Sequence, residues 1–97
     1  MKKAYAKNGR TCRVTFAVQP EGHVHTACLC GEFNGWDTTA HPMKRRKDGY
    51  FALTLSLAAG QQYRFRYFLD GARWENDQGA DAYVSNPFGG EDSVVQV

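Results

Sequence analysis

The chain has 97 residues, of which 42% are hydrophobic and 13% aromatic, which suffices for the core of one small domain and leaves no material for a second. A formal net charge of +2 is too small by itself to indicate a nucleic-acid or membrane partner, and no apolar run is long enough for a signal peptide or a membrane-spanning helix. We expect one domain over residues 1–97, with a loosely ordered basic segment at residues 1–10.

Three segments in the first half of the chain have the features of strands. Apolar and polar residues alternate over residues 12–18, as in a half-buried strand. A second strand is predicted over residues 23–30, after a turn that contains proline and glycine. The Lys-Asp-Gly turn at residues 47–49 then joins a short strand at residues 43–46 to a longer one at residues 50–57.

The second half of the chain continues this pattern. Apolar side chains share one face over residues 62–69, so the two arginines of the sequence YRFRYF fall on the other face. An Asp-Gly turn follows at residues 70–71, and Trp74 lies on the returning segment. Residues 79–91 show no clear alternation and are predicted to form a loop, and residues 93–97 form a last short strand.

Short strands at regular spacing, with turns marked by glycine or proline, indicate an all-β fold, an antiparallel β-sandwich of about seven strands. Four apolar residues are expected to face each other across its two sheets: Leu53, Leu55, Phe65 and Tyr67.

Cysteine usage predicts a reducing environment. The chain has three cysteines, an odd number, and Cys28 and Cys30 are separated by one residue. Two cysteines at this spacing on one strand are near the upper limit of the distance that a disulfide can bridge. We expect three free thiols and a cytoplasmic location.

No catalytic group of residues stands out. Four carboxylates lie close in sequence and are interpreted as solvated or turn-forming groups, not as an acid/base pair: Asp70, Glu75, Asp77 and Asp81. No nucleophile-elbow sequence and no glycine-rich phosphate loop occurs. We therefore expect no enzymatic activity and no cofactor.

A metal site is also disfavoured. His23 and His25 point to one face of a single strand, whereas Cys28 and Cys30 differ from them in parity and point to the other face. The four side chains cannot close around one zinc ion in that arrangement. We expect no metal.

The sequence YRFRYF interleaves arginines with aromatic residues, as single-strand nucleic-acid binders do. The rings of Tyr63, Phe65 and Tyr67 share the face of Leu69 and are interpreted as core. Arg64 and Arg66 are left on the other face with Phe68 beside them. The basic residues 45–47 are interpreted as a solvated turn. We expect no nucleic-acid partner.

Trp36 and Trp74 each follow a turn and lie outside the alternating core faces. Each ring could cap one end of the sandwich. Alternatively, two flat rings with Arg66 beside them suit a sugar, because a sugar ring has apolar C–H faces for stacking and a rim of hydroxyls for hydrogen bonds.

The chain resembles the glycogen-binding, isoamylase N-terminal-like modules of carbohydrate-binding family 48, which occur in branching and debranching enzymes and in the β-subunit of AMP-activated protein kinase. The resemblance runs from Cys12 to Val97 and rests on four segments in order: GEFNGWD, GYFALTLSL, YRFRYFLDGARWEND and NPFGGEDSVVQV. It implies an early-set immunoglobulin-like fold and non-catalytic binding of an α-1,4-glucan such as glycogen, starch or a maltooligosaccharide.

The resemblance also implies a binding site. Trp36 and Trp74 match the two tryptophans that stack on the glucan, and Arg66 stands where family members have a lysine that bonds sugar hydroxyls. Phe88 replaces an aliphatic loop residue that presses on the glucan, and Asp92 replaces an asparagine just before the last strand. We expect both rings on one exposed surface with Arg66 beside them, and Phe88 and Asp92 on the loop that closes its edge.

The alternative is a structural role. Many relatives in this family are non-binding domains packed against a catalytic barrel or kinase subunits. Since the chain begins with Met1 and shows no partner domain, we expect a stand-alone module. It could then be a structural or regulatory subunit that uses the same surface to pack on a partner, such as a glycogen-metabolising enzyme or a kinase.

Overall fold

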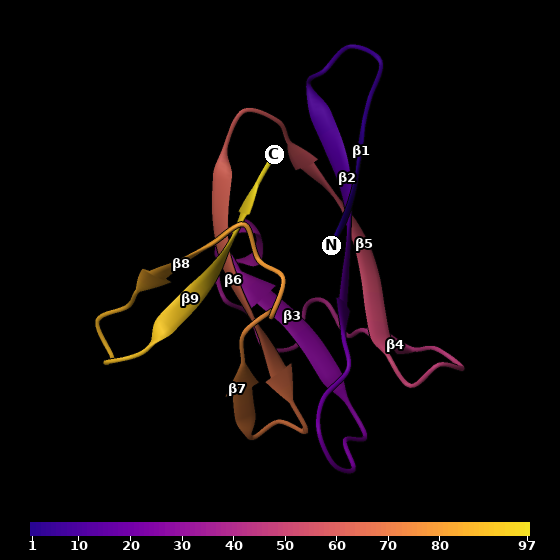
Figure 1. Ribbon diagram of the computed structural model, residues 1–97, viewed down its shortest axis with the longest axis vertical. Helices are drawn as coiled ribbons and strands as arrows, with labels where there is room; N and C mark the ends of the chain where they lie inside the picture. Colours follow the sequence, from indigo (N-terminus) through magenta and orange to yellow (C-terminus); the bar gives the residue numbers. More distant parts are fainter.

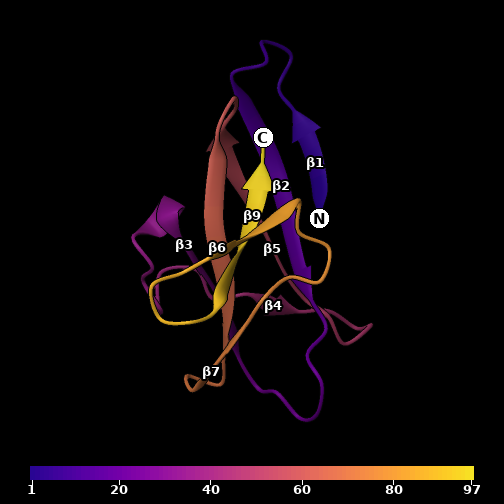
Figure 2. The same cartoon turned by 60° about the vertical axis from the view of Figure 1, so that its left-hand side comes forward.

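The computed structural model describes residues 1–97 and contains nine strands in two facing antiparallel sheets (Figures 1 and 2). The strands are β1 (Lys2–Tyr5), β2 (Thr11–Val18), β3 (Ala27–Gly31), β4 (Lys44–Arg45), β5 (Phe51–Ala58), β6 (Gln62–Leu69), β7 (Arg73–Glu75), β8 (Ala82–Ser85) and β9 (Glu91–Gln96). The first sheet has the order β1-β2-β5-β4, and the second has the order β3-β6-β9-β8 with β7 also paired to β6. This arrangement confirms the predicted immunoglobulin-like β-sandwich.

One turn of 3-10 helix, η1 (Glu32–Asn34), follows β3. No helix in the structure has the length and apolar character needed to span a membrane.

The core lies between the two sheets and depends on the predicted alternation. Val14 and Phe16 of β2 face Phe65 and Tyr67 of β6, and all four side chains are fully buried. Phe16 and Phe65 meet edge to face, with ring centroids 5.0 Å apart, a favoured geometry for aromatic pairs. The predicted inward faces of β2 and β6 are therefore confirmed.

Leu53 and Leu55 are less buried than expected. Both are half-buried and pack against the core cluster from its edge. Their strand, β5, pairs along its whole length with β2, but on its other side β4 covers only Phe51 and Ala52. The leucines therefore face the core beside an open sheet edge.

The expectation of a loosely ordered N-terminus is wrong. Residues 2–5 form β1, which pairs with β2 from Lys2↔Thr15 to Tyr5↔Cys12. The Lys3 ammonium also lies 2.6 Å from the Asp81 carboxylate in the second half of the chain. All four residues of β1 are exposed, so the sequence offers no apolar alternation from which this edge strand could be predicted.

The second predicted strand begins later than expected. β3 starts at Ala27, whereas the alternation indicated residues 23–30. The backbone amides of His25 and Thr26 donate to the Asp70 carboxylate at 2.7 and 2.9 Å. Since these amides bind a side chain, residues 25–26 do not extend the ladder of the sheet.

The loop predicted at residues 79–91 contains a strand. β8 pairs with β9 from Ala82↔Val94 to Ser85↔Glu91. It is an edge strand whose residues are exposed apart from the half-buried Val84. It therefore lacks the period-two signal of a half-buried strand.

Asp70 gives the fold a measurable dependence on pH. The amides of Thr26 and His25 lower the pKa of the Asp70 carboxyl below its ordinary value. This contribution to stability is complete above the ordinary pKa of about 3.9 and is lost as the pH falls through the lower pKa of the folded state.

We expect the melting temperature of the wild type to fall more between pH 5 and pH 2.5 than that of Asp70→Asn. The amide oxygen of asparagine can still accept both hydrogen bonds but does not titrate, and asparagine tolerates the backbone of Asp70, whose φ is 53°. Thermal unfolding followed by circular dichroism checks this. Equal losses in both proteins would show that Asp70 does not couple protonation to folding.

Candidate functional site

A shallow groove of about 550 Å³ lies on the outer face of the second sheet. Its lining residues are Glu32, Trp36, Arg64, Arg66, Trp74, Asn86, Pro87, Phe88 and Asp92. All five residues predicted to form the site are among them, although they come from the loop after β3, from β6, from β7, from the β8–β9 loop and from β9. The expected juxtaposition is thus present, and the binding role of these residues stays a prediction.

The groove lies where β6 changes its partner. β6 pairs with β9 over residues 62–65 and with β7 over residues 67–69, so β9 and β7 follow different halves of the strand (Figure 1). Arg66 lies between these two paired segments. Its side chain belongs to the outer face of the sheet at this change of partner.

The aromatic end contains three rings. Trp36 and Trp74 meet nearly edge to face, with ring centroids 6.5 Å apart. Phe68, opposite Trp74 in the β6–β7 ladder, lies 4.4 Å from it between centroids. Trp74 is 37% exposed, as expected, whereas Trp36 is half-buried and less exposed than expected. The two rings support one another and leave part of their surface open.

The loop that carries Trp36 is held by Asn34. The backbone amide of Gly31 donates to Asn34 Oδ1 at 3.1 Å, and Asn34 Nδ2 donates to the carbonyl of Leu29 at 2.9 Å. These two bonds fix the amide orientation, so the other Nδ2 hydrogen points to His41 Nδ1, which lies 2.8 Å away and acts as acceptor. One side chain thereby ties the start of the loop to its end.

Trp36 itself has an unusual backbone. Its φ is 60°, next to Gly35 at 64°. A bulky residue in the left-handed region is uncommon, and such strain is concentrated at functional sites. The backbone amide of Trp36 donates to the carbonyl of Gly31 at 2.8 Å, which closes the turn and directs the ring over the sheet toward Trp74.

Gly31 allows this loop to approach β6. A Cβ atom added at Gly31 would lie 2.5 Å from the Arg64 carbonyl oxygen and 2.9 Å from atoms of Phe33 and Phe65. We expect Gly31→Ala to lower the free energy of unfolding by about 1–3 kcal/mol, the usual cost of overpacking. Urea denaturation measures it.

Gly79→Ala is the matched control, because a Cβ atom there has ordinary contact with Asp77 at 3.5 Å. If Gly31→Ala has the same free energy of unfolding as this control, the close approach at Gly31 is not required.

Arg66 places its guanidinium against the tryptophans. The Arg66 Cζ atom lies 5.7 Å from the centroid of the Trp74 ring, within cation–π range. Arg66 Nε is buried and has no hydrogen-bond partner. A buried donor without a partner is costly, and a ligand oxygen could reach it only if the Arg66 side chain moved.

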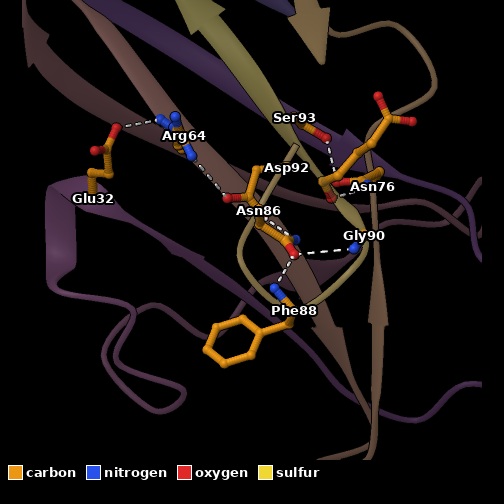
Figure 3. Close-up of polar contacts among 9 residues, drawn as sticks. Glu32, Arg64, Asn76, Asn86, Phe88, Gly90, Asp92 and Ser93 are labelled. Carbon is orange, nitrogen blue, oxygen red and sulfur yellow. Dashed lines mark hydrogen bonds and ion pairs between the residues drawn. The ribbon is translucent and has the colours of Figure 1, made fainter. Parts of the chain in front are cut away.

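The polar end of the groove is formed by the β8–β9 loop and its neighbours (Figure 3). Asn86 Oδ1 accepts the backbone amides of Phe88 at 3.0 Å and Gly90 at 3.1 Å, and Asn86 Nδ2 donates to Asp92 Oδ1 at 3.2 Å. The Phe88 ring points away from this loop (Figure 3) and is 93% exposed. The ring is therefore presented on a loop whose backbone is fixed.

Asp92 differs from its expected placement. It is the second residue of β9, not a loop residue, and is only 7% exposed. The predicted position at the edge of the groove is correct, but its carboxylate is directed toward other side chains.

The three thiols are free, as predicted. Cys28 and Cys30 lie on the groove side of β3, opposite Phe68 and Arg66. Burial raises the pKa of the Cys28 thiol, and burial together with Cys28 and Asp37 raises the pKa of Cys30 to about 11. These thiols are therefore protonated and uncharged at neutral pH.

The carboxylates considered for catalysis have structural partners. Asp81 binds Lys3 and Glu75 lies 3.6 Å from Arg73. Asp77 was expected to be solvated, but it is buried. It accepts a hydrogen bond from the Tyr67 hydroxyl at 2.6 Å. Burial and Asp77 raise the pKa of Tyr67, which keeps this hydroxyl a donor.

No group of three or more His, Cys, Asp or Glu side chains is arranged to hold a metal ion.

Three polar residues of the groove were missed as site residues: Glu32, Arg64 and Asn86. The sequence did contain a signal for Arg64, because this residue lies two positions from Arg66 and therefore shares the outer face of β6 with it. The view that this face has only Phe68 as an aromatic neighbour is wrong, since Trp36 and Trp74 come to it from other segments. Glu32 and Asn86 depend on loop conformations that alternation does not report.

An immunoglobulin-like sandwich with flat aromatic rings beside polar side chains in a shallow groove has the architecture of a carbohydrate-binding module. The chain belongs to the family of carbohydrate-binding module 48 (isoamylase N-terminal domain), whose sequence profile matches residues 5–89.

The chain is also similar to parts of bacterial enzymes. It is 38% identical over 58 residues to the 1,4-alpha-glucan branching enzyme GlgB 2 of Xanthomonas oryzae pv. oryzae, a match that covers 59% of this chain and 8% of the enzyme. The corresponding enzyme of Xanthomonas euvesicatoria pv. vesicatoria is 40% identical over 53 residues, covering 54% of this chain and 7% of the enzyme. The match therefore spans less than a tenth of these relatives.

Proposed function

We propose that this chain binds an α-1,4-glucan, such as glycogen, starch or a maltooligosaccharide, without catalysing a reaction on it. The observation that carries the proposal is the groove at which Trp36, Trp74 and Arg66 meet. The rings offer apolar surface for the C–H face of a glucose ring, and the guanidinium offers donors for its hydroxyls. The family match and the similarity to glucan branching enzymes support the same ligand class.

The charge of the groove favours a neutral ligand. Two arginines, Arg64 and Arg66, are matched by two carboxylates, Glu32 and Asp92. A nucleic acid or another polyanion would need a positive surface to offset its phosphates. We therefore propose no nucleic-acid partner, although arginines and aromatic rings occur together.

Affinity should be weak. A shallow groove buries only part of a flexible chain, and the ordering of ligand and side chains offsets much of the contact energy. We expect dissociation constants of the order of micromolar to millimolar.

Electrophoresis through native gels that contain glycogen tests the proposal. The chain should migrate more slowly as the glycogen concentration rises, whereas a gel with an equal mass of dextran, an α-1,6-glucan, should change its mobility much less. A single-stranded oligonucleotide added as competitor should not restore mobility. Unchanged mobility at every glycogen concentration would reject glucan binding by this chain.

The second candidate is a protein-interaction role, favoured by the near-complete exposure of the Phe88 ring. In this role the groove would pack on a partner, such as a glycogen-metabolising enzyme, in the cytoplasm, where the three free thiols would remain reduced. Relatives in which this segment is a small part of a branching enzyme are consistent with it. This candidate would be favoured if the chain could be cross-linked to a co-purified partner and if added maltoheptaose did not prevent that cross-linking.

A further inference from the structure

Asp92, the residue expected to bond sugar hydroxyls, has both carboxylate oxygens directed toward protein groups. Oδ1 accepts from Asn86 Nδ2 at 3.2 Å, and Oδ2 lies 3.9 Å from Arg64 Nη1. The Asp92 side chain is only 9% exposed. A carboxylate that is buried and directed toward two protein donors has little capacity left for a ligand.

Arg64 is the side-chain hydrogen-bond donor at this end of the groove that remains accessible. Its side chain is 43% exposed, and the residue lies between Glu32, which binds its backbone amide, and Asp92, which lies near its guanidinium (Figure 3). Its backbone is anchored independently, because the Arg64 amide donates to Glu32 Oε1 at 2.7 Å. Glu32 thus caps the edge of β6 just beyond the end of β3, and the Arg64 side chain can change without loss of that bond.

The two arginines address different parts of the groove. Arg64 and Arg66 are two residues apart on one face of β6, which separates their Cα atoms by about 6.4–6.8 Å along the strand. Arg66 lies against Trp74, whereas Arg64 lies toward Asp92, with Nη1 3.9 Å from the Asp92 carboxylate. A ligand that covers only the tryptophan end does not need Arg64, and one that follows the groove to its other end passes it.

We propose that Arg64 is a further glucan-contacting residue, which donates hydrogen bonds to hydroxyls of a sugar beyond the tryptophan pair, and that Asp92 is a positioning residue that holds the Arg64 guanidinium. The inference rests on the proposed function. It assigns to Arg64 the donors that an asparagine at position 92 would supply and that a carboxylate lacks. It also predicts that the contribution of Arg64 depends on ligand length.

The first test compares Arg64→Met with the wild type by calorimetric titration with maltotriose and maltoheptaose. Methionine keeps an unbranched stem over the buried Val94, which is paired with Arg64, and removes the donors. Affinity for maltoheptaose should fall about tenfold, the effect of one charged hydrogen bond, and affinity for maltotriose less than about twofold.

Arg13→Met is the matched control, because Arg13 is exposed on β2 of the other sheet. It should bind both sugars like the wild type. If Arg64→Met also binds both sugars like the wild type, the inference is overturned while the proposed function stands. A wild type that binds neither sugar nor glycogen overturns both.

The second test is a double-mutant cycle with Asp92→Asn, which preserves the shape of the side chain and removes its charge. Because Asp92 acts through Arg64, the change should weaken maltoheptaose binding severalfold in the wild type and have no further effect in Arg64→Met. The melting temperatures of the wild type, the two single variants and the double variant should not show this dependence of one substitution on the other. Equal losses in both backgrounds would show that Asp92 contacts the sugar directly and would overturn its assignment as a positioning residue.

Discussion

Replacing Trp36 with alanine should weaken binding of maltoheptaose at least about tenfold and leave the melting temperature nearly unchanged. Stacking on an aromatic ring contributes about 1–3 kcal/mol, a magnitude known from nucleic-acid bases, and about 1.4 kcal/mol corresponds to tenfold in affinity. The ring packs against Trp74 and lies outside the core cluster, so its loss removes little of the buried surface that stabilises the fold.

Calorimetric titration and thermal unfolding check both parts of this prediction. Tyr5→Ala serves as control, because Tyr5 is 56% exposed on β1 of the opposite sheet and its loss also deletes one surface ring. An unfolded Trp36→Ala together with a wild type that ignores glucans would identify Trp36 as a plug of the core and favour the structural interpretation.

The largest expected effect on stability follows the substitution of Phe65 by alanine. Phe65 is fully buried in the centre of β6, and its ring contacts Phe16 and Tyr67 at centroid distances of 5.0 and 5.7 Å. Truncation of such a ring costs about 3–5 kcal/mol, a large part of the about 5–15 kcal/mol that stabilise a typical domain. Urea denaturation should show a much lower midpoint.

Leu55→Ala calibrates this result. Since Leu55 is half-buried beside the open edge of β5, its truncation should cost at most about 2 kcal/mol, the low end for a leucine. A cost equal to that of Phe65→Ala would mean that the edge of β5 is covered in solution.

Strands with one buried face could be predicted from the sequence, and strands without one could not. The faces of β2 and β6 follow from period-two alternation, which burial of one side imposes. β1 and β8 are edge strands with mostly exposed side chains, so pairing with a neighbour, and not their own composition, makes them strands. The late start of β3 depends on Asp70, 45 positions beyond His25.

The candidate site likewise contains residues that the sequence could predict and contacts that it could not. Trp36 and Trp74 were found because large rings outside the core pattern are conspicuous, and the family resemblance supplied Phe88 and Asp92. Neither source indicated that the Asp92 carboxylate points to Arg64 and Asn86, because that contact depends on the register of β9 against β6 and on the loop conformation. Long-range register of this kind is invisible to local patterns.

The most direct measurement of the central claim is intrinsic fluorescence of the wild type titrated with maltoheptaose. The chain has only two tryptophans, and both line the groove, so a change in emission reports on this site. We predict a saturable change with a dissociation constant of the order of micromolar to millimolar, and none with the β-linked cellohexaose at equal concentration. Emission that maltoheptaose and glycogen leave unchanged, while circular dichroism shows a folded β-protein, would contradict the account.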